Sequence, residues 1–367
     1  MRPAALVFLF AAFVHCAGAA PDLKVVRNNG IDYVSLEEGA ARLGLRIERL
    51  VPPSAVLLKD GPKPVARLAD HSRETDINGL RVFFGDPVIE VRGAYYLSRI
   101  DYDTHLVPRL RPDLCLPIPP KPRVIAVDAG HGGLDRGTEN PALGTMEKTY
   151  TLDVAKRLKA LLETAGYKVV MTRESDATVT HEQRFELANK ADADLFISIH
   201  FNSLFPNTKT TGVEILTYPP RTQRSTESWS PGKKDDSRNP PEPVNSFDTW
   251  STVLGAVVHR SLLDAMHSSD RGAKLEHLKA LAGLKCPAVL VEPAFLSSGV
   301  EGVRLAQPAY RDTIAAAVFA GIQGYAELLG RLRPPAVTPP GVPAPASPSA
   351  SPAPAPRSPP TRPSPGP

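Results

Sequence analysis

Three side chains of metal-binding type stand at or just after the ends of apolar segments. His131 follows the apolar run 124–127 within the sequence Asp-Ala-Gly-His-Gly-Gly, and His200 ends the run 194–200. Glu147 opens the segment that follows a glycine-containing loop. Sites in open α/β sheets lie beyond the carboxyl ends of the strands, so these residues are expected to meet although they are far apart in the chain. Two imidazoles and one carboxylate leave a fourth position on zinc open to water, which is the arrangement of a catalytic zinc site.

A fourth side chain, Glu292, ends the apolar segment 288–292. A carboxylate in apolar surroundings is costly unless it has a partner or a task, and acting as a base beside metal-bound water is such a task. Each residue also has a simpler interpretation. Either histidine can be a hydrogen-bonded loop residue, Glu147 can be a carboxylate favoured at a helix N-terminus, and Glu292 can be salt-bridged. Spacing alone leaves both interpretations open.

The elements that must position these residues alternate between strands and helices from residue 123 to residue 331. Strands are expected at 124–127, 168–172, 194–200, 213–217 and 288–292, and helices at 147–165, 181–190, 249–267 and 309–329. This alternation predicts a three-layer α/β/α domain with a mostly parallel sheet. The polar, proline-rich stretch 219–245 is expected to be a long solvated surface loop.

Residues 22–111 have a different texture, with short alternating segments and one helical stretch at 36–45. They predict a small α+β domain with strands at 23–26, 32–35, 46–50, 55–59, 81–84 and 88–91. His71 and His105 each stand alone and are expected at the surface. A proline-rich linker, 112–122, separates this module from the larger domain.

The two ends of the chain are predicted to lie outside the folded part. Residues 1–20 combine Arg2, an apolar stretch and the small residues Ala17-Gly18-Ala19-Ala20, which is the pattern of a secretory signal. The apolar stretch is too short to span a membrane, so the mature protein is expected to be exported without a membrane span. Residues 334–367 hold 15 of the 39 prolines and predict a disordered Pro/Ala/Ser-rich tail.

The net charge argues against a nucleic-acid partner, and the cysteine content leaves one disulfide possible. The formal net charge is +4, with no basic patch, so no nucleic-acid partner is expected. Cys115 and Cys286 remain after removal of the signal, and the sequence does not settle whether they pair.

Five motifs occur in collinear order within residues 124–329, and together they contain His131, Glu147, His200 and Glu292. They are VIAVDAGHGGLDRGTENPALGTMEKTYTLDVAKRLKALLETAGYKVVMTRESD, ADADLFISIHFNS, GVEILT, DRGAKLEHLKAL and CPAVLVEPAFLSS. This region resembles the zinc-dependent N-acetylmuramoyl-L-alanine amidases, which cut bacterial peptidoglycan. The resemblance implies that His131, Glu147 and His200 bind one catalytic Zn²⁺ and that Glu292 is the catalytic carboxylate.

The function implied by the resemblance is hydrolysis of the amide bond between N-acetylmuramic acid and L-alanine, in cell-wall remodelling, daughter-cell separation or autolysis. Zinc would lower the pKa of its bound water to about 7, and Glu292 would pass the water proton to the departing amine. Asn202 and Lys274 are weaker candidates for substrate binding, and Asn202 could instead orient a metal ligand or form a turn. Arg173 and Arg184 are expected to be structural.

Two other functions remain open: a non-catalytic peptidoglycan-binding protein, and a zinc peptidase that cuts within the stem peptide. The expected location is the periplasm or cell envelope, or the medium. Peptidoglycan is the expected partner, a regulatory envelope protein is a further candidate, and the protein is expected to be a monomer.

The N-terminal module carries a second resemblance. The sequences NNGIDYVSLEEGAARLGLRIERL and INGLRVFFGDPVIEVRGAYYLSRID are similar to the copper amine oxidase N-terminal-like domain. The name implies no copper here, because the module contains no cluster of His or Cys. Its expected role is to bind peptidoglycan or a partner, or to pack on the catalytic domain.

Overall fold

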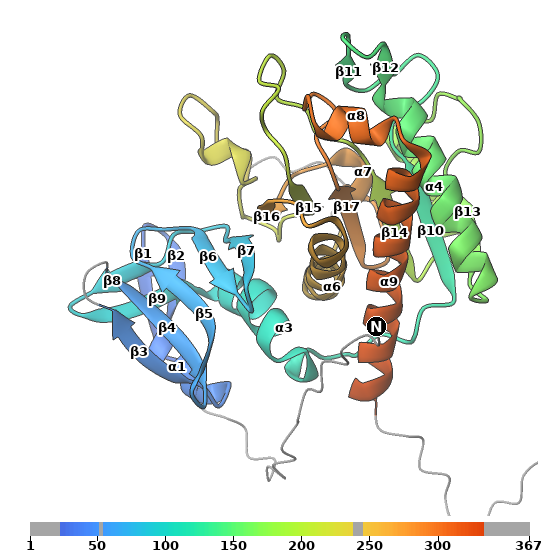
Figure 1. Ribbon diagram of the computed structural model, residues 1–367. Coiled ribbons are helices and arrows are strands. Elements are labelled where there is room, and N and C mark those ends of the chain that lie inside the picture. The colour runs from blue at the N-terminus through green and yellow to red at the C-terminus, as the bar shows by residue number, and fades with distance from the viewer. Residues whose placement is uncertain (1–22, 51–53, 238–244, 334–367) are drawn as a thin grey trace, which may run out of the picture. The chain divides into compact units, whose positions relative to one another are not determined.

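Strands and helices alternate from residue 124 to residue 332, as the apolar pattern predicts. The computed structural model describes residues 23–50, 54–237 and 245–333, so the predicted signal and tail lie outside the described residues. Six strands of the larger domain are neighbours in the order β13-β10-β14-β17-β15-β16 (Figure 1). Their bounds are β10 Val124–Ala129, β13 Lys168–Met171, β14 Leu195–Ile199, β15 Val213–Thr217, β16 Asp270–Leu275 and β17 Ala288–Glu292. All neighbours in this set are parallel except β15 and β17, so the sheet is mixed and mostly parallel.

Alternation along the strands supplies two apolar faces and hence three layers. Ile125 and Val127 belong to one core with α4 (Glu147–Thr164), α6 (Asp248–Met266) and α9 (Pro308–Leu332). The intervening Ala126 belongs to another core with α5 (His181–Lys190) and α7 (Lys279–Ala282). The predicted α/β/α architecture is therefore confirmed. The sequence interpretation missed β16, α7, α8 (Glu301–Leu305) and the short hairpin β11–β12 (Glu139–Asn140, Thr145–Met146).

Helix α9 has the length and the apolar composition of a membrane-spanning helix. Its contacts, however, are those of a core helix. Ile314, Val318 and Ile322 are fully buried in the core that α9 shares with α6. The two helices approach closely at Gly321, where a Cβ atom would lie 2.7 Å from Val258 Cα. We therefore assign α9 to the apolar core of the larger domain.

The N-terminal region contains two groups of antiparallel strands. One is the four-stranded sheet β1-β2-β9-β8, and the other is the meander β3 to β7. The strands are β1 Val25–Asn28, β2 Ile31–Ser35, β3 Arg46–Leu50, β4 Ala55–Asp60, β5 Lys63–Ala69, β6 Glu74–Ile77, β7 Leu80–Phe83, β8 Ile89–Val91 and β9 Ala94–Ser98. The helical pieces are α1 Leu36–Arg42, α2 Arg99–Asp101, η1 Tyr102–Leu106, α3 Val107–Leu110 and η2 Pro112–Leu114. The region is β-rich, and β5, β6 and β9 were not predicted.

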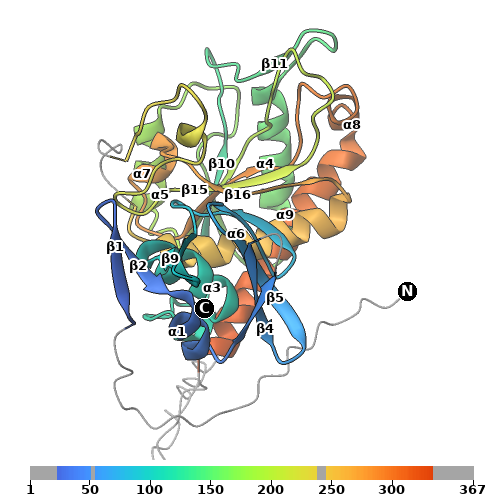
Figure 2. The ribbon, with the colours of Figure 1, turned by 90° about the vertical axis from the view of Figure 1, so that its left-hand side faces the viewer.

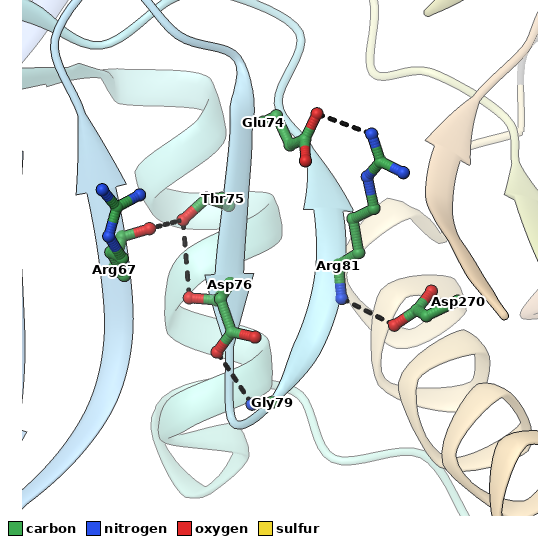
Figure 3. A pocket seen from close by; sticks show the side chains of 7 residues that line it. All are labelled: Arg67, Glu74, Thr75, Asp76, Gly79, Arg81 and Asp270. Carbon is green, nitrogen blue, oxygen red and sulfur yellow. Dashed lines mark hydrogen bonds and ion pairs between the residues drawn. The ribbon is translucent and has the colours of Figure 1, made fainter.

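The meander continues the sheet of the larger domain. Val82 of β7 lies opposite Ala273 of β16 in a parallel bridge, which makes one sheet of 11 strands within the compact unit that ends at Leu332. In the second view the blue N-terminal strands lie below the labels of β15 and β16 (Figure 2). The backbone N–H of Arg81 donates to Asp270 Oδ2 at 2.9 Å across this seam (Figure 3). A pocket of about 380 Å³ also lies at this seam. Its lining does not include His131, Glu147, His200 or Glu292.

The prediction of a solvated loop at 219–245 was wrong for its first part. Gln223 is 2% exposed and Ser225 is 1% exposed, and a short helix, η3 (Glu227–Trp229), follows them. Gln223 Nε2 donates to Asp101 Oδ1 at 2.9 Å, and Arg73 donates to the carbonyl of Thr226 at 3.1 Å. Gln223 and Thr226 thus have hydrogen-bond partners in the N-terminal region, which local composition does not reveal. Residues 238–244 lie outside the described residues.

The surface position predicted for His105 was also wrong. His105 is 2% exposed, and its Nε2 lies 3.3 Å from Gln223 Oε1. Burial, together with the charge of Arg109, lowers the pKa of His105 to about 3, so the ring is neutral at physiological pH. His71 is exposed, as predicted.

Candidate functional site

The fold brings His131, Glu147 and His200 together at one edge of the sheet. His131 lies in the loop after β10, Glu147 is the first residue of α4, and His200 directly follows β14. One ligand atom from each residue lies within 4.8 Å of the other two. The parallel pairing of β10 with β14 explains this meeting, because it places the carboxyl ends of both strands side by side.

Two glycines make room for the cluster. A Cβ atom at Gly130 would lie 2.4 Å from His200 Nε2. A Cβ atom at Gly137 would lie 2.6 Å from Glu147 Oε2, and the φ of +66° at this residue also favours glycine. Any larger residue at either position would displace a member of the cluster.

The Glu147 carboxylate lies between the two imidazoles. Its Oε2 is 3.1 Å from His131 Nε2, and its Oε1 is 2.9 Å from His200 Nδ1. Oε2 also accepts a hydrogen bond from the backbone N–H of Thr138, and Oε1 accepts one from that of Phe201. Burial opposes ionisation of Glu147, but the hydrogen bonds and charges of both histidines outweigh it and hold the pKa of this carboxyl well below its ordinary value. Two imidazole nitrogens and an ionised carboxylate form a donor set that suits zinc.

Asp135 was missed by sequence reasoning, although it lies within the GHGGLD segment. Its Oδ2 lies 2.8 Å from His131 Nδ1. A carboxylate on the outer ring nitrogen fixes the orientation of a metal-binding histidine and leaves the other nitrogen for the ion. The signal for it was a carboxylate in the same loop as the histidine.

A buried ion pair supports the loop that carries His131. The guanidinium of Arg184 pairs with Asp128, and Ser198 donates a further hydrogen bond to Asp128. Arg184 also donates to the carbonyl of His131 at 2.8 Å. Arg173 donates to the carbonyls of Ala129 and Gly130, each at 2.9 Å. Both arginines thus make contacts that support the loop, in agreement with a structural role.

Glu292 ends β17 and lies directly opposite Glu214 of the antiparallel strand β15. Its Oε2 is buried and has no hydrogen-bond partner among the described residues. Burial, followed by the charges of Glu147 and Glu214, raises the pKa of Glu292 well above its ordinary value, while Lys274 acts in the opposite direction. A buried carboxyl oxygen without a partner, in a group with a raised pKa, makes Glu292 a candidate for proton transfer.

Asn202 and Lys274 both contact Glu214, which sequence reasoning missed. Lys274 Nζ lies 2.8 Å from Glu214 Oε1, and Asn202 Nδ2 donates to Oε2 at 2.8 Å. Glu214 is 5% exposed, so this is a buried network. The signal for it was a carboxylate within the otherwise apolar segment GVEILT.

Cys115 and Cys286 are both free, and both are buried. They belong to different apolar cores of the larger domain. The structure therefore contains no disulfide between these two residues.

Comparison with known proteins gives matches that each extend over about 56% of this chain. A probable cell wall amidase LytH of Staphylococcus saprophyticus is 32% identical over 208 residues, which are 56% of this chain and 60% of that protein. An uncharacterized cell wall amidase of Bacillus anthracis is 29% identical over 215 residues, which are 57% of this chain and 36% of that protein. The chain thus spans less than two thirds of the length of either relative. Among solved structures, the N-acetylmuramoyl-L-alanine amidase AmiC2 of Nostoc punctiforme is similar with 27% identity and a TM-score of 0.46, over 56% of this chain and 97% of that one.

The family model described as N-acetylmuramoyl-L-alanine amidase matches residues 125–324. This range contains His131, Glu147, His200 and Glu292 and extends over more than half of the sequence. The chain therefore belongs to the N-acetylmuramoyl-L-alanine amidase family.

Proposed function

We propose that this protein is a zinc hydrolase that cleaves the amide bond between N-acetylmuramic acid and L-alanine in peptidoglycan. The observation that carries the proposal is the cluster of His131, Glu147 and His200 within a region that matches the amidase family. The unpaired carboxyl of Glu292 supplies the acid–base group that amide hydrolysis requires.

The proposed zinc ligands are His131 Nε2, a Glu147 carboxylate oxygen and His200 Nδ1, because each of these imidazole nitrogens lies within hydrogen-bond distance of a Glu147 oxygen. When bound, zinc lowers the pKa of a water ligand to about 7 and polarises the scissile carbonyl. Asp135 orients His131, and the backbone N–H of Phe201 orients the Glu147 carboxylate. These groups hold the donor set in place before the substrate arrives.

Glu292 is the proposed acid and base of the reaction. Its carboxylate accepts a proton from the attacking water, and the carboxylic acid then donates that proton to the departing amine of L-alanine. Burial and the neighbouring carboxylates raise its pKa, which makes the ionised form a stronger base and keeps the proton available for transfer. The unpartnered Oε2 leaves the group free to exchange this proton.

The proposed location is the periplasm or cell envelope, or the medium, with residues 1–20 as the export signal. The amidase family supports an envelope location, and two relatives are named cell wall amidases. Peptidoglycan is the proposed partner of a monomeric enzyme, and a regulatory envelope protein remains a further proposed partner. The similarity of residues 22–111 to the copper amine oxidase N-terminal-like domain likewise stays a proposal.

Release of peptides from purified peptidoglycan by the full-length protein tests the proposed function. A chelator should abolish release, and added zinc should restore it. Mass spectrometry should find peptides that begin with the free amine of L-alanine. Products cut within the stem peptide would instead support a zinc peptidase, and no release by the zinc-bound protein would support a peptidoglycan-binding role.

A further inference from the structure

Three neighbouring strands place two carboxylates and one ammonium on the same face of the sheet. Glu214 lies directly opposite Glu292 across β15 and β17. Lys274 lies opposite Leu216, two residues from Glu214, across β15 and β16. Directly opposite residues and their neighbours two positions away point to one face of a sheet. The ammonium of Lys274 therefore has two carboxylates within the same small region.

The ammonium is bound to only one of these carboxylates. Lys274 Nζ lies 2.8 Å from Glu214 Oε1, while Glu292 Oε2 has no partner among the described side chains and backbone groups. Asn202, the other polar side chain of the network, donates to Glu214 Oε2. Arg271 lies farther away, with its Nε 3.6 Å from Glu214 Oε1. Glu214 thus binds both the Lys274 ammonium and the Asn202 amide.

We infer that Glu214 is a positioning residue that binds Lys274 and Asn202 and so keeps the Glu292 carboxyl free for proton transfer. The inference rests on the role proposed for Glu292. It also reassigns Asn202 and Lys274 from substrate binding to this network. Lys274 is well placed to change partner, because its side chain is 16% exposed and a buried charge that loses its partner is costly.

Loss of the Glu214 charge should therefore transfer the ammonium to Glu292. In Glu214→Gln, Lys274 should form an ion pair with Glu292, and release of peptides should fall about 100-fold, as expected when a general base is blocked. The double variant Glu214→Gln/Lys274→Met also removes the ammonium. Its rate of peptide release should be about tenfold higher than that of Glu214→Gln, since residues in one network are coupled. A double variant no more active than Glu214→Gln would overturn the inference.

A conservative variant separates positioning from folding. Glu214→Asp keeps the negative charge and should retain most of the activity, whereas equal losses in Glu214→Asp and Glu214→Gln would indicate a structural role only. Asp153→Asn is the matched control, because it removes a carboxylate from the ion pairs with Arg157 and Arg311 away from the site. Thermal unfolding and zinc content of each variant are measured alongside activity.

A crystal structure of Glu214→Gln gives a result that does not depend on activity. Lys274 Nζ should lie within hydrogen-bond distance of a Glu292 oxygen. An ammonium that remains on the amide oxygen of the new side chain, with Glu292 unpaired, would contradict the inference. Lack of peptide release by the parent protein would contradict the proposed function instead, so the two failures are distinguishable.

Discussion

At the scale of single residues, the position of Glu292 gives the sharpest prediction about chemistry. Glu292→Gln keeps the size and shape of the side chain but removes the group that accepts a proton. We expect peptide release to fall about 10²- to 10⁴-fold, the usual contribution of a general acid or base. Zinc content, measured by atomic absorption, should stay at the parent level because Glu292 is not among the three converging ligands. Full activity in this variant would refute the assigned role.

Asp135 gives a second prediction at this scale, which concerns the metal and not the proton. Asp135→Asn weakens the hydrogen bond to His131 Nδ1. It should lower zinc affinity about 10- to 100-fold, as loss of the hydrogen-bond partner of a metal-binding histidine usually does. Competition with a coloured chelator measures the affinity. Glu139→Gln is the control, because Glu139 is an exposed carboxylate nearby in sequence that pairs with Arg136. Equal effects in both variants would mean that loop charge alone controls zinc binding.

Sequence motifs located the residues of the site more readily than their partners. Residue type and strand position pointed to the three proposed ligands and to Glu292. Glu214 was missed because its importance depends on strand register: β15 places it opposite Glu292, and β16 brings Lys274 to it. No local sequence pattern determines the register between strands that are distant in the chain.

At the scale of elements, the ends of β10 and β14 are held together by a buried charge. Asp128 of β10 pairs with Arg184 of α5 and accepts hydrogen bonds from Ser198 of β14 and from Thr172. Asp128→Asn should lower the free energy of unfolding by about 3–5 kcal/mol at pH 7, because it leaves the Arg184 guanidinium buried without its carboxylate. Urea unfolding measures this loss.

The same ion pair predicts a dependence of stability on pH. Burial opposes ionisation of Asp128, but the Arg184 charge and the hydrogen bonds from Ser198 and Thr172 outweigh it and lower the pKa of Asp128. A lowered pKa in the folded state adds stability above the unfolded value of about 3.9, and this stability is lost as the pH falls through the folded value. The difference between parent and Asp128→Asn should therefore shrink below about pH 4. A difference that stays constant at lower pH would contradict this assignment.

The layers of the larger domain were predictable because each element carries its own period. Strands 213–217 and 288–292 and helix 181–190 have the predicted bounds. The short pieces β11, β12 and α8 were missed because two to five residues show no period. Strand β16 was missed because Arg271, Gly272 and Lys274 make its sequence polar, and its burial comes from the strands on either side.

At the scale of the whole molecule, the contact between the N-terminal region and the larger domain was the least predictable feature. A bridge between Val82 and Ala273 joins the meander β3 to β7 to the sheet of the larger domain. The stretch around Gln223 adds a buried contact that its polar composition conceals. Both contacts join residues far apart in sequence, and neither has a local pattern. The N-terminal region is therefore packed on the larger domain, and it reaches the Glu214 network through Phe83, whose ring centroid is 5.9 Å from Lys274 Nζ.

Gln223 gives the prediction that tests this packing. Its amide nitrogen donates to Asp101 Oδ1, and its oxygen lies 3.3 Å from His105 Nε2. Gln223→Ala removes both contacts and should lower the free energy of unfolding by about 1–3 kcal/mol for each buried group left without a partner. Calorimetry should show one cooperative transition in the parent, because the two regions share a sheet, and a single transition at lower temperature in the variant. Two separate transitions in the parent would mean that the regions unfold independently and that this contact contributes little to the stability of the catalytic sheet.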